Sequence, residues 1–162
     1  MELPKPEGHT CFACGTANSI GMNLRFYLEG NEIRTDITLR KDYEGWENMA
    51  HGGIISTLLD EVMSWTILYF RRVFFVTRRM EVKYVRPVLV GVPLRACGRL
   101  VHEEDKRFIH VQAEVQNGEG HVLAKAKGEF VELQPERLAA VPEAMKKQMS
   151  DLFERFETLS PP

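Results

Sequence analysis

The sequence predicts an α+β fold in which an antiparallel sheet of about six strands wraps around one long central helix, followed by an amphipathic helix at the C-terminus. The first observation is that apolar side chains recur at three- and four-residue spacing over residues 54–68, which is the period of a helix. These side chains cover nearly the whole circumference, and such a helix must be surrounded by other elements. The second observation is that segments with strand-like alternation lie on both sides of the helix and are joined by short turns, which favours antiparallel pairing.

The predicted strands cover residues 23–28, 33–39, 76–85, 93–101, 108–115 and 121–133. Gly30-Asn31 is a turn signal between the first two, and residues 103–106 and 117–120 are turn signals between the last three. Residues 41–50 are predicted as a loop. Alternation over 76–85 places Met80, Val82 and Tyr84 on one face of that strand. The other face then carries Thr77, Arg79, Glu81 and Lys83.

The chain divides into three parts. Residues 1–22 are predicted as an irregular N-terminal lead-in, residues 23–133 as the sheet-and-helix domain, and residues 134–162 as a C-terminal helical extension. Pro142 suits the start of the last helix, because the amide hydrogen that proline lacks has no partner there. A single sheet of this size leaves an edge or a face that needs a partner, so we expect a dimer or a larger assembly.

Composition excludes several classes of protein. The 162 residues carry 21 basic and 23 acidic side chains, so no overall positive field attracts nucleic acid. The apolar run at 54–69 contains two acids and falls short of the ~20 residues of a membrane span, and the N-terminus lacks the apolar stretch of a signal peptide. Three cysteines are too few for a disulfide scaffold. We therefore expect a cytoplasmic protein with neither a nucleic acid nor a membrane as partner.

His51-Gly52-Gly53 opens the predicted central helix. Amides in the first turn of a helix lack intrahelical acceptors, and the helix dipole makes this end positive. Two glycines allow a ligand atom to approach these amides closely. A carbonyl oxygen placed there would be polarised, and negative charge developing on it would be stabilised. The competing interpretation is a flexible entry turn with a capping histidine.

Asp60 lies two and a half turns beyond His51, among apolar neighbours. Burying a carboxylate is costly unless it is paired or useful, and burial raises its pKa toward that of a competent base. It could activate water or attack as a nucleophile. Glu61 is the neighbouring candidate, about 100° further around the helix. The competing interpretation is that one or both acids point to solvent.

Several motifs carry a family resemblance. Gly45-Trp46, His51-Gly52-Gly53 and Leu58-Leu59-Asp60-Glu61 are followed by Thr77 and by Val82-Lys83-Tyr84-Val85-Arg86-Pro87, and the lead-in contains Cys11-Phe12-Ala13-Cys14-Gly15. Over residues 10–133 the chain resembles the hotdog-fold acyl-CoA thioesterases of the phenylacetate-pathway (PaaI-like) branch.

The resemblance implies hydrolysis of an acyl-CoA thioester to the free acid and coenzyme A. It implies that the amide of Gly52 or Gly53 contacts the thioester carbonyl, that His51 shapes the turn, and that Asp60 activates water or attacks the carbonyl. Thr77 would help to hold the water and would come from the partner subunit. The expected assembly is a homodimer or a dimer of dimers with the active site at the subunit interface. No cofactor is expected beyond the coenzyme A of the substrate.

One position departs from the family pattern. Relatives often carry asparagine six residues before the histidine, where this chain has Gly45, and Asn48 is the nearest substitute. Asn48 and Glu61 are kept as candidate substrate contacts. Because of this departure, a non-catalytic module that binds or senses acyl-CoA remains an alternative function. A third alternative is an acyl-thioester hydratase or dehydratase, although its usual signature with a histidine acid/base is absent.

Two further groups of residues could bind a ligand or a metal ion. Cations that could contact the phosphates of coenzyme A cluster after the central helix, namely Arg78, Arg79, Lys83 and Arg86, with Arg71-Arg72 preceding them. Cys11 and Cys14, with His9 upstream, have the spacing of half a zinc site. Because no second pair of ligands is evident, we expect no metal.

Overall fold

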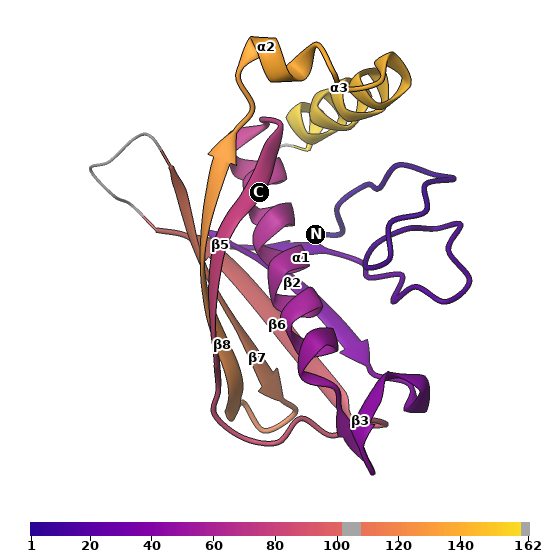
Figure 1. Cartoon of the computed structure of the whole chain (residues 1–162), viewed down its shortest axis with the longest axis vertical. Coiled ribbons are helices and arrows are strands. Elements are labelled where there is room, and N and C mark those ends of the chain that lie inside the picture. Colours follow the sequence, from indigo (N-terminus) through magenta and orange to yellow (C-terminus); the bar gives the residue numbers. More distant parts are fainter. Residues whose placement is uncertain (102–107, 160–162) are drawn as a thin grey trace.

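The computed structural model describes residues 1–101 and 108–159 of the chain. Six strands form one antiparallel sheet in the order β1-β2-β6-β7-β8-β5 (Figure 1). They are β1 (Tyr27–Glu29), β2 (Glu32–Thr38), β5 (Phe75–Tyr84), β6 (Pro93–Leu100), β7 (Ile109–Asn117) and β8 (Val122–Glu132). Gly30 has a φ of +60° between β1 and β2, which confirms the predicted turn. The predicted turn at 103–106 lies outside the described residues.

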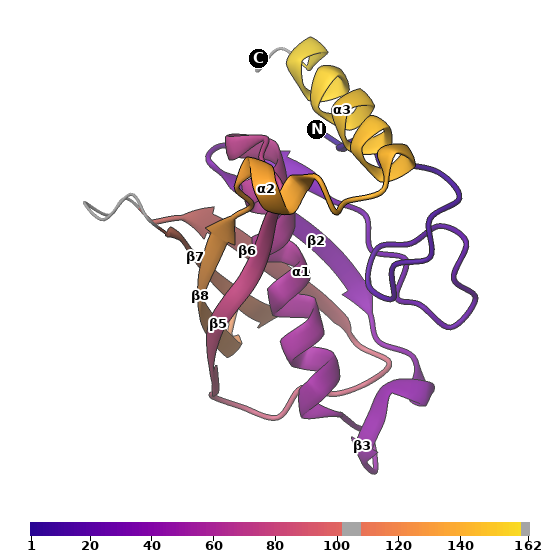
Figure 2. The same cartoon turned by 45° about the horizontal axis from the view of Figure 1, so that its top comes forward.

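Helix α1 (Gly52–Arg71) lies against one face of the curved sheet (Figures 1 and 2). Its contacts with β2, β6, β7 and β8 bury Leu59, Val62 and Met63 completely. Gly98 on β6 permits the close approach, because a Cβ there would lie 2.5 Å from the Thr66 hydroxyl of α1. The α+β architecture with one wrapped helix is therefore confirmed.

Four short elements were not predicted. Residues expected to form a loop before α1 contain a 3-10 helix (Lys41–Tyr43) and a small hairpin of β3 (Glu44–Trp46) and β4 (Met49–Ala50). The hairpin turn is closed by the Glu44 carboxylate, which accepts from the amide of Asn48 at 2.8 Å. Helix α2 (Pro135–Leu138) precedes the predicted C-terminal helix, which is α3 (Glu143–Thr158) with Pro142 as its N-cap residue.

The prediction for the faces of β5 was wrong at one residue. The register with β8 shifts between Thr77 and Arg79, because Arg78 is an extra residue in the strand. Such a bulge turns the following side chains to the opposite face. Thr77 pairs with buried Phe130 and shares its face, the one toward α1, with Met80, Val82 and Tyr84. Arg79, Glu81 and Lys83 remain on the outer face.

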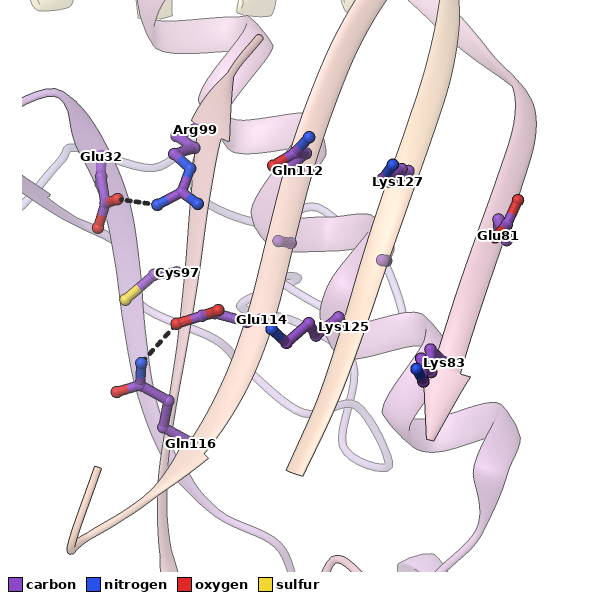
Figure 3. A pocket seen from close by; sticks show the side chains of 12 residues that line it. Glu32, Glu81, Lys83, Cys97, Arg99, Gln112, Glu114, Gln116, Lys125 and Lys127 are labelled. Carbon is purple, nitrogen blue, oxygen red and sulfur yellow. Dashed lines mark hydrogen bonds and ion pairs between the residues drawn. The ribbon is translucent and has the colours of Figure 1, made fainter. Parts of the chain in front are cut away.

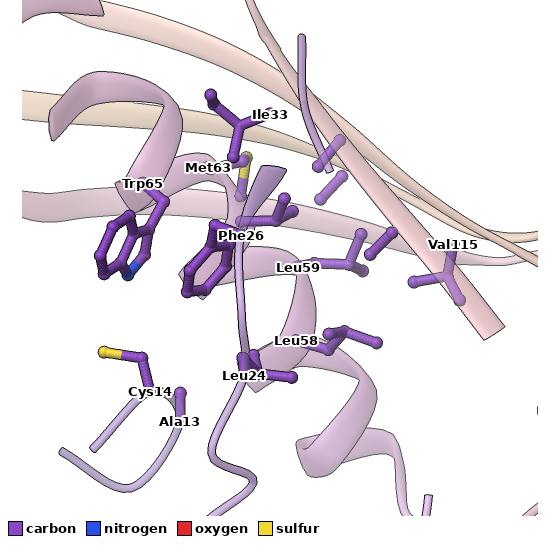
Figure 4. Packing of buried hydrophobic residues seen from close by; sticks show 14 of the residues in the cluster. Ala13, Cys14, Leu24, Phe26, Ile33, Leu58, Leu59, Met63, Trp65 and Val115 are labelled. Carbon is purple, nitrogen blue, oxygen red and sulfur yellow. The ribbon is translucent and has the colours of Figure 1, made fainter. Parts of the chain in front are cut away.

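The N-terminal lead-in and α3 together cover the C-terminal half of α1. Trp65 of α1 stacks on Phe26, with ring centres 4.4 Å apart, and meets Phe156 of α3 edge-on at 6.3 Å. Figure 4 shows Ala13 and Cys14 of the lead-in on the side of Trp65 and Phe26. Across the described ranges, no helix is long and apolar enough to span a membrane.

Candidate active site

The N-terminus of α1 presents one free amide. The Nδ1 atom of His51 accepts a hydrogen bond from the Gly53 amide at 3.0 Å, so His51 is the N-cap and the Gly53 amide is occupied. The Gly52 amide has no intrahelical acceptor, and no other acceptor for it occurs in the described part of the chain. The sequence left Gly52 and Gly53 as equal candidates, and the structure leaves Gly52 as the donor for a ligand.

Tyr84 fixes this turn and was missed by the sequence reasoning. Its hydroxyl donates to the Gly52 carbonyl at 3.0 Å and lies 2.7 Å from the Ser56 hydroxyl. A Cβ on Gly52 would meet the Tyr84 hydroxyl at an ordinary 3.4 Å. The sequence did contain a signal for Tyr84, because the alternation along this strand places it on the same face as Met80 and Val82.

Asp60 and Thr77 form the second part of the site. The Thr77 hydroxyl donates to the Asp60 carboxylate at 3.0 Å. Burial raises the pKa of Asp60 above its ordinary value, and the hydrogen bond from Thr77 opposes that rise. The threonine beside Asp60 belongs to the same chain, whereas the sequence led us to expect it from a partner subunit. The bulge at Arg78 turns Thr77 toward the helix of its own chain.

Glu61 faces away from this pair. Its carboxylate accepts from the Trp65 indole at 3.1 Å and lies beneath the N-terminal lead-in, beside Cys11 and Cys14. Burial raises the pKa of Glu61 to about 7. The position one residue after Asp60 thus belongs to a different face of α1, and the structure does not bring Glu61 together with Asp60 as a substrate contact.

The hairpin before α1 explains the departure at Gly45. A Cβ on Gly45 would lie 3.1 Å from both Cα and Cδ2 of His51, so a larger residue there would press on the N-cap. Asn48 is exposed at the tip of the hairpin with a φ of 61°, where it forms the turn. Its amide donates to Glu44 and its carbonyl accepts from the Val90 amide, and neither contact belongs to the Asp60 or Gly52 part of the site.

The predicted phosphate-binding cations do not gather around Asp60 within one chain. Arg78 pairs with Glu129, and its guanidinium lies 4.6 Å from the centre of the Phe108 ring. Arg86 donates to the Val122 carbonyl at 2.6 Å.

The other two cations lie on the outer face of the sheet. Arg79 lies 4.0 Å from Glu81, and both side chains are exposed. Lys83 lines a groove of about 370 Å³ on the side of the sheet away from α1, with Lys125 and Lys127 beside it (Figure 3).

Fold and site together define a class of protein, a hotdog domain with a carboxylate on its central helix and a free amide at the start of that helix. Residues 47–124 match the family model of the thioesterase superfamily, so this part of the chain is similar to that superfamily and the predicted resemblance is confirmed. No curated protein sequence matches the chain.

Solved structures share the fold. A thioesterase superfamily protein is 26% identical with a TM-score of 0.67, over 72% of this chain and 57% of that one. The PaaI protein of the Escherichia coli phenylacetic acid degradation operon is 16% identical, with a TM-score of 0.62, over 70% of this chain and 81% of its own. A Streptococcus mutans protein bound to acetyl-CoA is 24% identical, with a TM-score of 0.60, over 68% of this chain and 89% of its own.

Proposed function

We propose that this protein hydrolyses an acyl-CoA thioester to the free acid and coenzyme A. The observation that carries the proposal is the pair formed by Asp60 and Thr77 on the open face of α1, in a domain similar to the thioesterase superfamily. The bound acetyl-CoA in the Streptococcus mutans structure supports this class of substrate.

The chemistry follows from the two parts of the site. Asp60 accepts a proton from water, which attacks the thioester carbon, or its carboxylate attacks that carbon to form a transient anhydride that water then opens. The carbonyl oxygen gains negative charge in either case. The Gly52 amide, at the positive end of the helix dipole, stabilises that charge. The carbon–sulfur bond then breaks, and coenzyme A leaves as a thiol after taking up a proton.

One chain cannot supply both parts to one carbonyl. Gly52 and Asp60 are eight residues apart on the same helix, which at a rise of about 1.5 Å per residue separates them by roughly 12 Å along its axis. Even in a straight line, the hydrogen bond to the carbonyl oxygen (about 2.9 Å), the carbonyl bond (about 1.2 Å), the attack distance of the water (about 3.2 Å) and its hydrogen bond to the base (about 2.8 Å) span only about 10 Å. We therefore propose that each site combines Asp60 of one subunit with Gly52 of the partner subunit.

The contacts within a chain are compatible with such a site. Tyr84 contacts Gly52, and Thr77 contacts Asp60. Ser56 lies midway between the two helix positions, and the centre of β5 lies midway between the two strand positions. A two-fold axis passing beside Ser56 and the centre of β5 would exchange the two pairs and bring each Asp60 opposite a Gly52.

The surface beside β5 supports the same assembly. β5 is a ten-residue edge strand, and no strand among the described residues pairs with its second edge, which offers backbone groups of the kind that pair with another chain. Tyr84, on the face of this strand toward α1, is 53% exposed, which is unusual for an aromatic side chain beside a core helix. We propose a homodimer formed through β5 and the open face of α1.

A thiol-release assay over a panel of acyl-CoAs tests the function. The parent protein should release coenzyme A, and Asp60→Asn should reduce the rate by about 10²- to 10⁴-fold, the usual contribution of a general base. Asp151→Asn, which changes an exposed acid on α3, is the matched control and should leave the rate unchanged.

The outcomes separate the candidate functions. Equal rates for the parent and Asp60→Asn would overturn the role of Asp60. Tight binding of acyl-CoA by the parent without turnover of any substrate would identify a binding or sensing module instead. Loss or gain of water across an enoyl thioester without thiol release would identify a hydratase or dehydratase.

A further inference from the structure

Three chemically reactive side chains meet on the closed face of α1. Cys11 and Cys14 of the N-terminal lead-in and Glu61 of α1 each place one ligand atom within 4.8 Å of the others. The two cysteines are separated from Glu61 by the whole first hairpin and by the loop before α1. The proposed hydrolysis uses none of these three side chains.

His9 adjoins the cluster through Cys14 and is a fourth potential donor, although it is not one of the three residues whose ligand atoms all lie within 4.8 Å of one another. Its Nε2 lies 3.4 Å from the Cys14 sulfur. Two ligands of a tetrahedral zinc ion, with a Zn–S bond of about 2.3 Å and a Zn–N bond of about 2.0 Å, are separated by about 3.5 Å. The contact is a hydrogen bond in this structure, and its length is close to the separation of two ligands that share one ion.

The backbone around the cysteines is constrained to hold them in this position. The Gly15 amide donates to the Cys11 carbonyl at 2.9 Å, which closes the turn that contains both sulfurs. A Cβ on Gly15 would lie 2.4 Å from that carbonyl oxygen, so only glycine fits. Cys14 is buried and lies on the side of Trp65 (Figure 4), whereas Cys11 is exposed.

Lys5 supports the same turn from outside the cluster. Its ammonium group donates to the Cys14 carbonyl at 2.9 Å and to the Leu24 carbonyl at 2.7 Å. It places a positive charge next to two thiols and a carboxylate, which would carry three negative charges when deprotonated.

We propose that His9, Cys11, Cys14 and Glu61 bind a zinc ion. Two sulfurs, one imidazole and one carboxylate form a donor set suited to tetrahedral zinc. Four protein ligands leave no open position, so the ion is structural. It ties the N-terminal lead-in to α1 at the residue next to Asp60. The sequence reasoning expected no metal because the remaining ligands, Glu61 above all, are brought to the cysteine pair only by the tertiary fold.

Metal content and cobalt substitution test this site directly. The full-length protein, purified with a reductant and without a polyhistidine tag, should contain about one zinc ion per chain by mass spectrometry of the metal. After chelation and reloading with Co²⁺ alone, it should show the absorption of tetrahedral cobalt with a thiolate-to-metal charge-transfer band.

Single substitutions identify the ligands. Cys11→Ser and Glu61→Gln should each weaken Zn²⁺ binding by about 100-fold or more, since losing even a contact that supports a ligand costs about 10- to 100-fold. Both keep the size of the side chain, and Cys11 is exposed, so these variants should fold. Cys97→Ser, at the third cysteine on β6, is the matched control and should bind Zn²⁺ like the parent.

Two results would overturn the proposal. One is a reduced parent protein that holds no stoichiometric zinc and gives no tetrahedral cobalt spectrum. The other is a Zn²⁺ affinity that Cys11→Ser and Glu61→Gln leave unchanged. Both readouts are independent of hydrolysis, so they stand apart from the fate of the proposed function.

Discussion

The two faces of α1 differ in how they are covered. On the face beside β5, Asp60 and Gly52 are held by single hydrogen-bonded contacts to Thr77 and Tyr84 and are partly open to solvent. On the opposite face, Glu61 and Trp65 lie beneath the N-terminal lead-in and α3.

A change of about 100° around one helix thus separates two adjacent acids into different surroundings. The open face can bind a substrate or a second subunit, whereas the closed face contributes packing. Mutations on the two faces should therefore affect different properties.

The largest expected effect is on the closed face. Phe156→Ala removes a ring that packs on Trp65 and Tyr69, and truncating a buried phenylalanine costs about 3–5 kcal/mol of unfolding free energy. Urea denaturation measures the loss. Met145→Ala, on an exposed position of the same helix, should change stability by less than about 0.5 kcal/mol. Equal losses for the two variants would show that α3 is not docked as described.

On the open face, Thr77→Val should alter the pH dependence of hydrolysis. The Thr77 hydroxyl favours the charged form of Asp60, so its loss raises the pKa of Asp60 further. The base must be deprotonated, and the acidic limb of the pH–rate profile should move to higher pH. The rate on that limb should fall about 10- to 150-fold, because a hydrogen bond to a charged group is worth about 1.5–3 kcal/mol. An unchanged profile would contradict the contact.

Tyr84→Phe should have a smaller effect at the start of α1. It removes the hydrogen bonds to Gly52 and Ser56, each worth about 0.5–1.5 kcal/mol. We expect a modest loss of stability in thermal melts and a several-fold loss of thioesterase rate. Tyr27→Phe, on β1 at the other edge of the sheet, is the control. A stability loss without any rate change would limit Tyr84 to a structural role.

The smallest effect concerns stability as a function of pH. The pKa of Asp60 is raised in the folded chain, so the folded state binds more protons than the unfolded state between the two pKa values. Stability therefore falls as pH rises through this window, which begins near the ordinary value of about 3.9. Asp60→Asn removes this dependence. Its stability relative to the parent should increase from acidic to neutral pH, and a constant difference in melting temperature would contradict the raised pKa.

Local patterns were sufficient to predict much of the fold. The apolar periodicity of α1 and the turn at Gly30 are short-range signals, and both elements formed as expected. The bulge at Arg78 depends on the register with β8, which no alternation within one strand contains. For this reason the face of Thr77 was predicted wrongly.

The sequence pointed to Asp60 and to the start of α1 as the candidate site, but it predicted only part of the contacts that these residues make. Asp60 and Gly52 follow from helix geometry. The capping of Gly53 by His51 depends on a side-chain rotamer, and the meeting of Glu61 with Cys11 depends on tertiary packing. Neither is encoded in residue spacing.

Complementation between two inactive variants tests most directly the claim that the site is shared between subunits. Gly52→Pro deletes the amide hydrogen at the first helical position, where proline is tolerated, and the extended backbone of His51 suits a following proline. Gly52→Pro and Asp60→Asn should each be nearly inactive alone. Random mixing makes half of the dimers hybrid, each with one complete site, so the mixture should recover about a quarter of the parental rate. A mixture that contains hybrid dimers and remains as inactive as the separate variants would contradict the shared site.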